Sequence, residues 1–144
     1  MVALPFCHFE IQAARPKPAK YPKKINSLGD HIRARRLDLK LLQEQVAYKI
    51  GVHKMTITSW ERNATVPEVR YMPSIIRFLG YDPLPPANAF PERLATARRV
   101  LGLSQRKMAE QLGVDPGTVQ GWEAGQHQPT GRSLDVIGKV LQIM

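Results

Sequence analysis

The chain is short and strongly basic: its 144 residues include 21 Lys and Arg against 12 Asp and Glu, which gives a net charge of +9. This excess favours a polyanionic partner, either nucleic acid or an acidic membrane face. One cysteine, Cys7, excludes an intramolecular disulfide, and no apolar stretch approaches the roughly 18 residues of a membrane span. The first residues also lack the basic-then-apolar order of a signal peptide, so we expect a cytoplasmic protein with no membrane partner.

Residues 1–27 are expected to form a basic, proline-rich arm. Such a composition resists packing into a core, so the arm could be simply disordered. Arms of this kind also follow the minor groove or the backbone of DNA in many DNA-binding proteins. If the arm contacts phosphates, the residues expected to do so are Arg15, Lys17, Lys20, Lys23 and Lys24.

A gap-free internal repeat follows the arm. Residues 28–80 overlay residues 90–142, with each counterpart 62 positions further along the chain. The two tryptophans of the chain, Trp60 and Trp122, align, and each is followed by a glutamate. Chance does not produce this agreement inside matching apolar patterns, so we infer two copies of one small domain, 28–80 and 90–144. Residues 81–89 contain three prolines and are predicted to form a short, semi-stiff linker.

The apolar spacing of the second copy predicts four short helices and no strand. The first covers 90–101, with Leu94 and Leu101 on its apolar side, and the second covers 105–112 after Ser104 as N-cap. The third begins at Asp115-Pro116, and the last covers 131–141, with Leu134, Ile137 and Leu141 on its apolar side. Two helices separated by about three residues, the first ending in glycine, form a helix-turn-helix unit.

The segments LLQEQVAYKIGVHKMTITSWERNATVP (41–67) and LSQRKMAEQLGVDPGTVQGWEAGQHQP (103–129) resemble the helix-turn-helix signature of the Cro/C1-type, or Xre, family. The resemblance covers residues 28–142 and leaves the arm unexplained. It implies an all-α fold of two tandem five-helix, lambda-repressor-like domains, in which the third helix reads the major groove of DNA. It also implies a prokaryotic, nucleoid-associated transcription regulator that is not an enzyme and needs no cofactor.

The resemblance further implies which residues contact DNA. Gln43 and Gln105 match a glutamine that grips a backbone phosphate, and Thr56, Thr118 and Arg62 match other phosphate-contacting positions. The base-reading positions of copy one are His53, Lys54, Met55, Thr58 and Ser59. Those of copy two are Asp115, Pro116, Gly117, Gln120 and Gly121.

The two copies are not equivalent as readers. Only Gln120 in copy two offers an amide that could bond adenine with two hydrogen bonds. We therefore expect copy one to make most base contacts and copy two to dock mainly on the backbone. Copy one also has weaker caps, because Leu42 and His53 stand where copy two has Ser104 and Asp115.

Several conspicuous residues have structural interpretations. Trp60 and Trp122 lie on the inner side of the third helix and are expected in the cores. The resemblance pairs Glu61 with Arg36 and Glu123 with Arg98, which would fix helix orientation rather than bind a ligand. The four histidines and Cys7 show no paired metal-ligand spacing, so no metal site is expected.

Two functions remain open. The first is sequence-specific binding of double-stranded DNA by the third helix of one or both domains, in a regulator of transcription. The alternative is a protein-interaction module, such as an antitoxin or scaffold, in which copy two binds a protein partner. One chain could supply both reading modules, so we expect a monomer with an internal domain pair or a homodimer. The half-sites on DNA could be direct or inverted.

Overall fold

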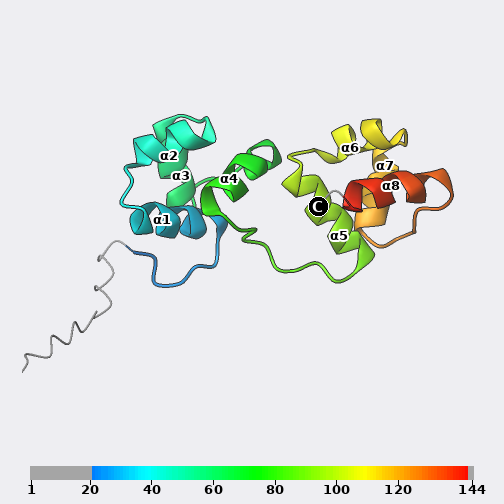
Figure 1. Ribbon diagram of the computed structural model, residues 1–144, viewed down its shortest axis with the longest axis horizontal. Helices are drawn as coiled ribbons and strands as arrows, with labels where there is room; N and C mark the ends of the chain where they lie inside the picture. Colours follow the sequence, from blue (N-terminus) through cyan, green and yellow to red (C-terminus); the bar gives the residue numbers. More distant parts are fainter. Residues whose placement is uncertain (1–20, 143–144) are drawn as a thin grey trace, which may run out of the picture.

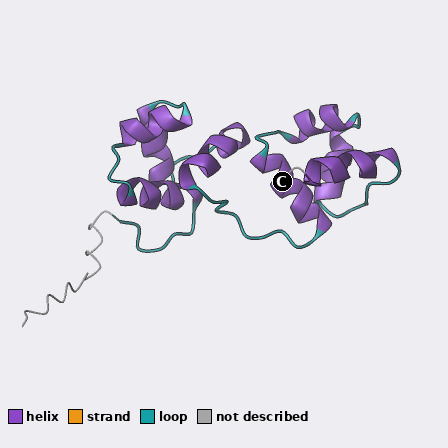
Figure 2. Cartoon of the chain, in the orientation of Figure 1, coloured by secondary structure: helices purple, strands orange, loops and turns teal. Residues whose placement is uncertain are grey.

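The computed structural model describes residues 21–142 of the chain, and Arg15, Lys17 and Lys20 of the arm lie outside the described residues. The described part consists of eight α-helices and one short 3-10 helix, without a strand (Figure 2). The helices form two groups joined by an extended linker (Figure 1). The predicted all-α fold of two tandem helix-turn-helix domains is therefore confirmed.

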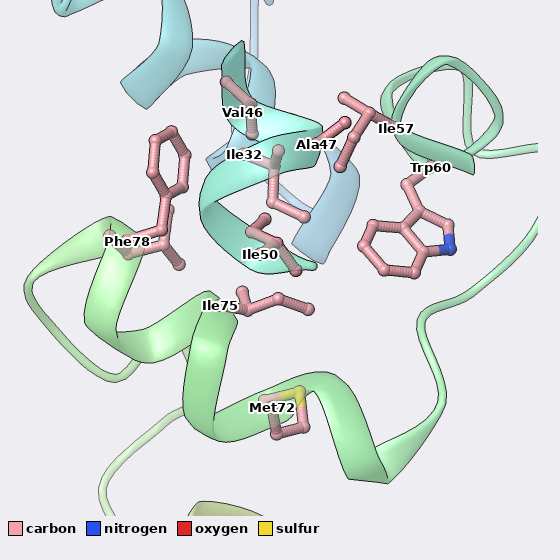
Figure 3. Close-up of a cluster of buried hydrophobic side chains, with 10 residues drawn as sticks. Ile32, Val46, Ala47, Ile50, Ile57, Trp60, Met72, Ile75 and Phe78 are labelled. Atoms are coloured by element: carbon pink, nitrogen blue, oxygen red, sulfur yellow. The ribbon is translucent and has the colours of Figure 1, made fainter. Parts of the chain in front are cut away.

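Domain 1 packs its helices around a core of buried aliphatic and aromatic side chains, which converge from every helix (Figure 3). Its elements are α1 (Leu28–Asp38), α2 (Gln43–Ile50), α3 (Lys54–Glu61), the 3-10 helix η1 (Val69–Tyr71) and α4 (Met72–Leu79). Trp60 is only 3% exposed and lies beside Tyr71, with ring centroids 5.6 Å apart. Trp60 is thus a core residue, as predicted.

Domain 2 repeats this arrangement with α5 (Phe90–Val100), α6 (Gln105–Leu112), α7 (Pro116–Glu123) and α8 (Arg132–Gln142). The predicted inward positions Met108, Leu112, Val119 and Trp122 are all buried. Two leucines that were expected on the apolar sides of their helices are exposed. Leu101 is 42% exposed and follows the last residue of α5, Val100; Leu134 is 51% exposed, whereas Ile137 is buried as expected and Val136 packs against the core.

Each domain has four α-helices among the described residues, not the five that the resemblance implies. In domain 1 the chain leaves the helical conformation at Gly80, which has φ +83° and caps α4 in the left-handed region. Three prolines follow within six residues, and none can donate a hydrogen bond to a continuing helix. The segment after α4 therefore extends as the linker rather than coiling into a fifth helix.

The caps of the helix-turn-helix units largely follow the sequence. Ser104 Oγ accepts from the amide of Lys107, and Asp115 Oδ1 accepts from that of Gly117 at 2.8 Å. Leu42 makes no side-chain cap; instead Gln45 Oε1 accepts from the Leu42 amide at 2.8 Å. This hydrogen bond from Gln45 partly replaces the N-cap that the Leu42 side chain cannot provide.

A polar cluster joins the start of α1 to the end of α3. Ser27 Oγ accepts from the Asp30 amide and donates to Asn63 Oδ1, while Asp30 accepts from the amides of Asn26 and Ser27 and from Asn63 Nδ2. Burial on its own would raise the pKa of Asp30, but these hydrogen bonds outweigh burial and lower it below its usual value of 3.8. The ionised carboxylate therefore stabilises domain 1.

Asp30→Asn should lower the stability of domain 1 at pH 7 by about 1 kcal/mol, the usual value of such a cap. Because the folded pKa is depressed, the carboxylate stabilises above its unfolded pKa, and the contribution is lost as pH falls through the folded pKa. Urea unfolding at a series of pH values should show the two proteins converging as pH drops below 3.8. A constant difference down to the acid limit would contradict this account.

No helix in the described range is long and apolar enough to cross a membrane.

Candidate nucleic-acid interface

A buried ion pair holds α3 of domain 1 in place. Arg36 of α1 donates to both carboxylate oxygens of Glu61 of α3, from Nε at 2.6 Å and from Nη2 at 2.8 Å. Its Nη1 also donates to the carbonyl of Leu41, just before α2. One guanidinium therefore fixes three segments relative to one another, as expected for a pair that orients helices.

The predicted phosphate-gripping glutamine is part of the same network. Gln43 Nε2 donates to Glu61 Oε2 at 2.9 Å, and its Oε1 accepts from the hydroxyl of Thr58. The hydroxyl of Thr58, a predicted base-reading residue on α3, therefore holds the side chain of Gln43. The second N–H of the Gln43 amide lies on a partly exposed side chain, available to an external acceptor.

Domain 2 contains the same ion pair. Arg98 donates to both oxygens of Glu123, at 2.6 and 3.1 Å, and to the carbonyl of Leu103. Gln105 Nε2 donates to Glu123 Oε2 at 2.8 Å. Both predicted Arg–Glu pairs are confirmed, and the Arg–Glu–Gln part of the network recurs in both domains, whereas Gln120 stands where Thr58 holds Gln43 in domain 1.

An open hollow of 470 Å³ lies where α1, α2 and α3 of domain 1 meet, and we call it the basic groove. Four cationic side chains line it, two from α1 and two from α3 and the residue directly after it. The lining residues are Arg33, Arg36, Leu37, Leu42, Gln43, Glu44, Lys54, Glu61 and Arg62. Arg36 is neutralised by Glu61, and Glu44 offsets one more cation, so Arg33, Lys54 and Arg62 leave the groove with a net positive charge.

Domain 2 has lost these three charges. The repeat places Ala95, Pro116 and Ala124 at the positions of Arg33, Lys54 and Arg62. The structural pair is kept, and the loss is partly offset at the groove position of Glu44, where the repeat places Arg106. The corresponding region of domain 2 is therefore less basic than the basic groove of domain 1.

The exposed side of α3 carries most of the predicted base-reading residues. His53, Lys54 and Met55 are exposed, the last at 64%, and Ser59 is partly exposed. His53 Nδ1 accepts from the Met55 amide at 3.3 Å, so this histidine caps α3 through one ring nitrogen. The predicted phosphate contacts Thr56 and Arg62 lie on or just after the same helix, half-buried and exposed.

The exposed side of α7 is poorer in side chains. Asp115, Pro116, Gly117 and Gln120 are exposed, and Thr118 is half-buried. Because Asp115 is occupied as the N-cap, Gln120 is the one long polar group that α7 itself presents among the predicted positions.

Gly121, predicted as a base-reading position, is buried instead. The imidazole of His127, from the loop after α7, lies directly over it: a Cβ built on Gly121 would come within 2.1 Å of His127 Cε1. The His127 side chain is exposed. Its imidazole occupies the space on α7 that corresponds to the position of the Ser59 side chain on α3. Its presence beside the reading helix is not evident from the sequence, because the contact depends on the path of the loop.

Arg33 was likewise not among the predicted contacts. It lies on α1, outside the helix-turn-helix segment, and only the packing of α1 against α3 brings it to the basic groove. The excess of arginine in α1 is the one signal in the sequence that could have indicated it.

Of the predicted arm residues within the described range, Lys23 and Lys24 are both exposed. Within that range no group of three His, Cys, Asp or Glu side chains is placed to hold a metal ion.

Comparison with known proteins agrees with this architecture. The Helix-turn-helix family model HTH_3 matches residues 32–84 and again residues 94–143. The HTH-type transcriptional regulator DicA of Escherichia coli (strain K12) is 39% identical over 51 residues, which are 35% of this chain and 38% of that protein. The chain thus spans well under half the length of this curated relative, and no solved structure matches it. Because the family model matches most of the chain, in two places, the chain belongs to the DNA-binding Cro/C1-type helix-turn-helix family and carries two domains of that family in tandem.

Proposed function

We propose that the protein is a sequence-specific regulator of transcription that inserts α3 of domain 1 into the major groove of double-stranded DNA. The observation that carries the proposal is the combination of an exposed polar row on α3 with the basic groove at its side. A major groove about 12 Å wide admits one helix, whose polar side chains then meet base edges.

The basic groove supplies the positioning contacts in this arrangement. Arg33, Lys54 and Arg62 are placed to neutralise phosphates beside the groove that α3 enters. Gln43 adds the free N–H of an amide that Glu61 already holds in a fixed orientation. The preorganised amide loses little freedom when it donates to a phosphate oxygen.

Base reading is assigned to Lys54, Met55 and Ser59, with His53 able to act through its second ring nitrogen. Lysine bonds guanine, and a serine hydroxyl bonds either a donor or an acceptor on a base edge. Domain 2 contributes Gln120 and phosphate contacts from Gln105 and Thr118. His127, whose imidazole lies over Gly121, would add a polar group at the position that corresponds to Ser59.

A second function is favoured by the loss of cations from domain 2. With Ala95, Pro116 and Ala124 in place of three basic residues, and Arg106 in place of Glu44, this region of domain 2 is less basic and suits a protein partner better than domain 1 does. In that case domain 1 alone would bind DNA, and domain 2 would recruit or be controlled by another protein, as in an antitoxin or scaffold.

Selection from a random duplex library with the full chain tests the main proposal. We expect one enriched motif. The logarithm of the binding constant for it should fall linearly with the logarithm of the salt concentration, with a slope of about −0.9 per phosphate neutralised. A domain-2 half-site in the motif would exclude the protein-partner alternative. Weak binding to every sequence alike, lost at moderate salt, would refute specific regulation.

A further inference from the structure

The two domains contact each other directly. Helix α4 of domain 1 packs against α5 of domain 2, and the turn after α5 meets the start of α4 (Figure 1). At this point Gly102 faces Pro73: a Cβ on Gly102 would come within 2.9 Å of Pro73 Cγ and 3.4 Å of the Arg70 carbonyl oxygen. The domains are therefore in van der Waals contact at a position where a side chain cannot fit without displacement.

The repeat shows why a glycine stands here. Gly102 has φ +69°, and its counterpart in domain 1, Lys40, has φ +54°. The turn in domain 1 thus accepts a lysine in the left-handed region, although such residues are uncommon there. The backbone conformation alone does not require glycine, whereas the approach of Pro73 does.

The linker is also attached to domain 1 rather than hanging free. Tyr81 shares a hydrogen bond with His31 Nδ1 at 2.9 Å, and Leu84 packs against the domain 1 core. At the far end, Glu92 of α5 accepts from the amides of Asn88 and Ala89. Between these anchors, Pro85, Pro86 and Ala87 line a hollow together with residues of α5.

The contact is asymmetric. In a two-fold pair, contact of α4 with α5 would require α1 to contact α8 as well, because the same surfaces face each other. Instead α1 and α8 lie at opposite ends of the molecule (Figure 1). The last helix of domain 1 meets the first helix of domain 2, which is a head-to-tail relation. Helices α2 and α6 nevertheless lie on one side of the molecule (Figure 1).

We propose that the two domains form one head-to-tail reading unit, held by the contact of Gly102 with Pro73, which selects DNA carrying two unequal half-sites in the same orientation. The inference rests on the proposed function and names its DNA substrate more closely. A two-fold dimer of domains would read an inverted repeat, whereas head-to-tail modules follow the duplex in one direction.

The free chain tests the contact without DNA. Backbone 15N relaxation of the full chain should give one rotational correlation time for both domains. Gly102→Asn introduces a residue that tolerates the left-handed region but adds a Cβ against Pro73. In this variant we expect each domain to have its own correlation time. The matched control is Gly113→Asn, at φ +67° with no atom within 4 Å of a Cβ, which should leave one correlation time. Two different times in the unmodified chain would overturn the fixed contact.

The random duplex library tests the half-sites. We expect a motif with two different half-sites in direct orientation at one spacing, near one helical turn. Reversing one half-site, or inserting five base pairs, should weaken binding by about 100-fold, the gain that joining two modules provides. Gly102→Asn should broaden the selected spacing, while Gly113→Asn should not. An inverted repeat or a single half-site would overturn the inference but leave the proposed function standing; a library without any enriched motif would overturn both.

Discussion

Replacing Glu61 with alanine should lower the free energy of unfolding of domain 1 by about 3 kcal/mol, because it leaves the guanidinium of Arg36 buried without a counter-ion. The Glu61 side chain is 3% exposed, and it accepts hydrogen bonds from Arg36 and Gln43. A small domain has a total stability on the order of 5 kcal/mol, so this single change should leave domain 1 barely folded.

The chain offers a convenient measurement, since each domain holds one tryptophan in its core. With Trp122→Phe as background, Trp60 fluorescence reports urea unfolding of domain 1 alone. The control is Glu68→Ala, which breaks an exposed pair with Arg70 and should cost less than about 1 kcal/mol. If the Glu61 and Glu68 variants unfolded at the same urea concentration, the proposed role of the buried pair would be wrong.

The double variant Lys54→Ala, Ser59→Ala should abolish most of the discrimination between the selected DNA site and a scrambled duplex. Loss of two base-reading side chains at about 1–3 kcal/mol each corresponds to roughly a hundredfold or more in specificity. Gln120→Ala should cost less, about tenfold, because it removes one base contact from the domain that we expect to dock mainly on the backbone.

Both variants are compared on one site by competition with scrambled DNA at fixed salt. Lys49→Ala, Ser74→Ala removes the same two residue types from a hollow between α2 and α4, outside the basic groove, and should keep the discrimination. A larger loss from Gln120→Ala than from the double variant would reverse the assignment of the two domains.

The local structure could be predicted from the sequence wherever one residue dictates it. Ser104 and Asp115 mark helix starts because their oxygens accept amide hydrogen bonds, and α6 and α7 begin directly after them. The Arg–Glu pairs followed from the family resemblance. Leu101 and Leu134 were placed wrongly because apolar spacing does not define where a helix ends or which way it is rotated.

The features that the sequence could not predict all depend on tertiary placement. Arg33 reaches the basic groove through the packing of α1, and His127 reaches α7 through a loop whose course no local pattern specifies. The approach of Pro73 to Gly102 joins residues of different domains. Glycine at position 102 is visible in the sequence, but the reason for it is not.

The cover that His127 places over Gly121 limits how domain 2 can be redesigned. A helix graft that copies the exposed residues of α3 onto α7 would put a serine at position 121, where its Cβ would collide with the imidazole ring. The exposed imidazole would have to turn away before the grafted helix could present the same surface as α3. Positions 121 and 127 are therefore coupled, and a library that varies α7 should vary position 127 with it.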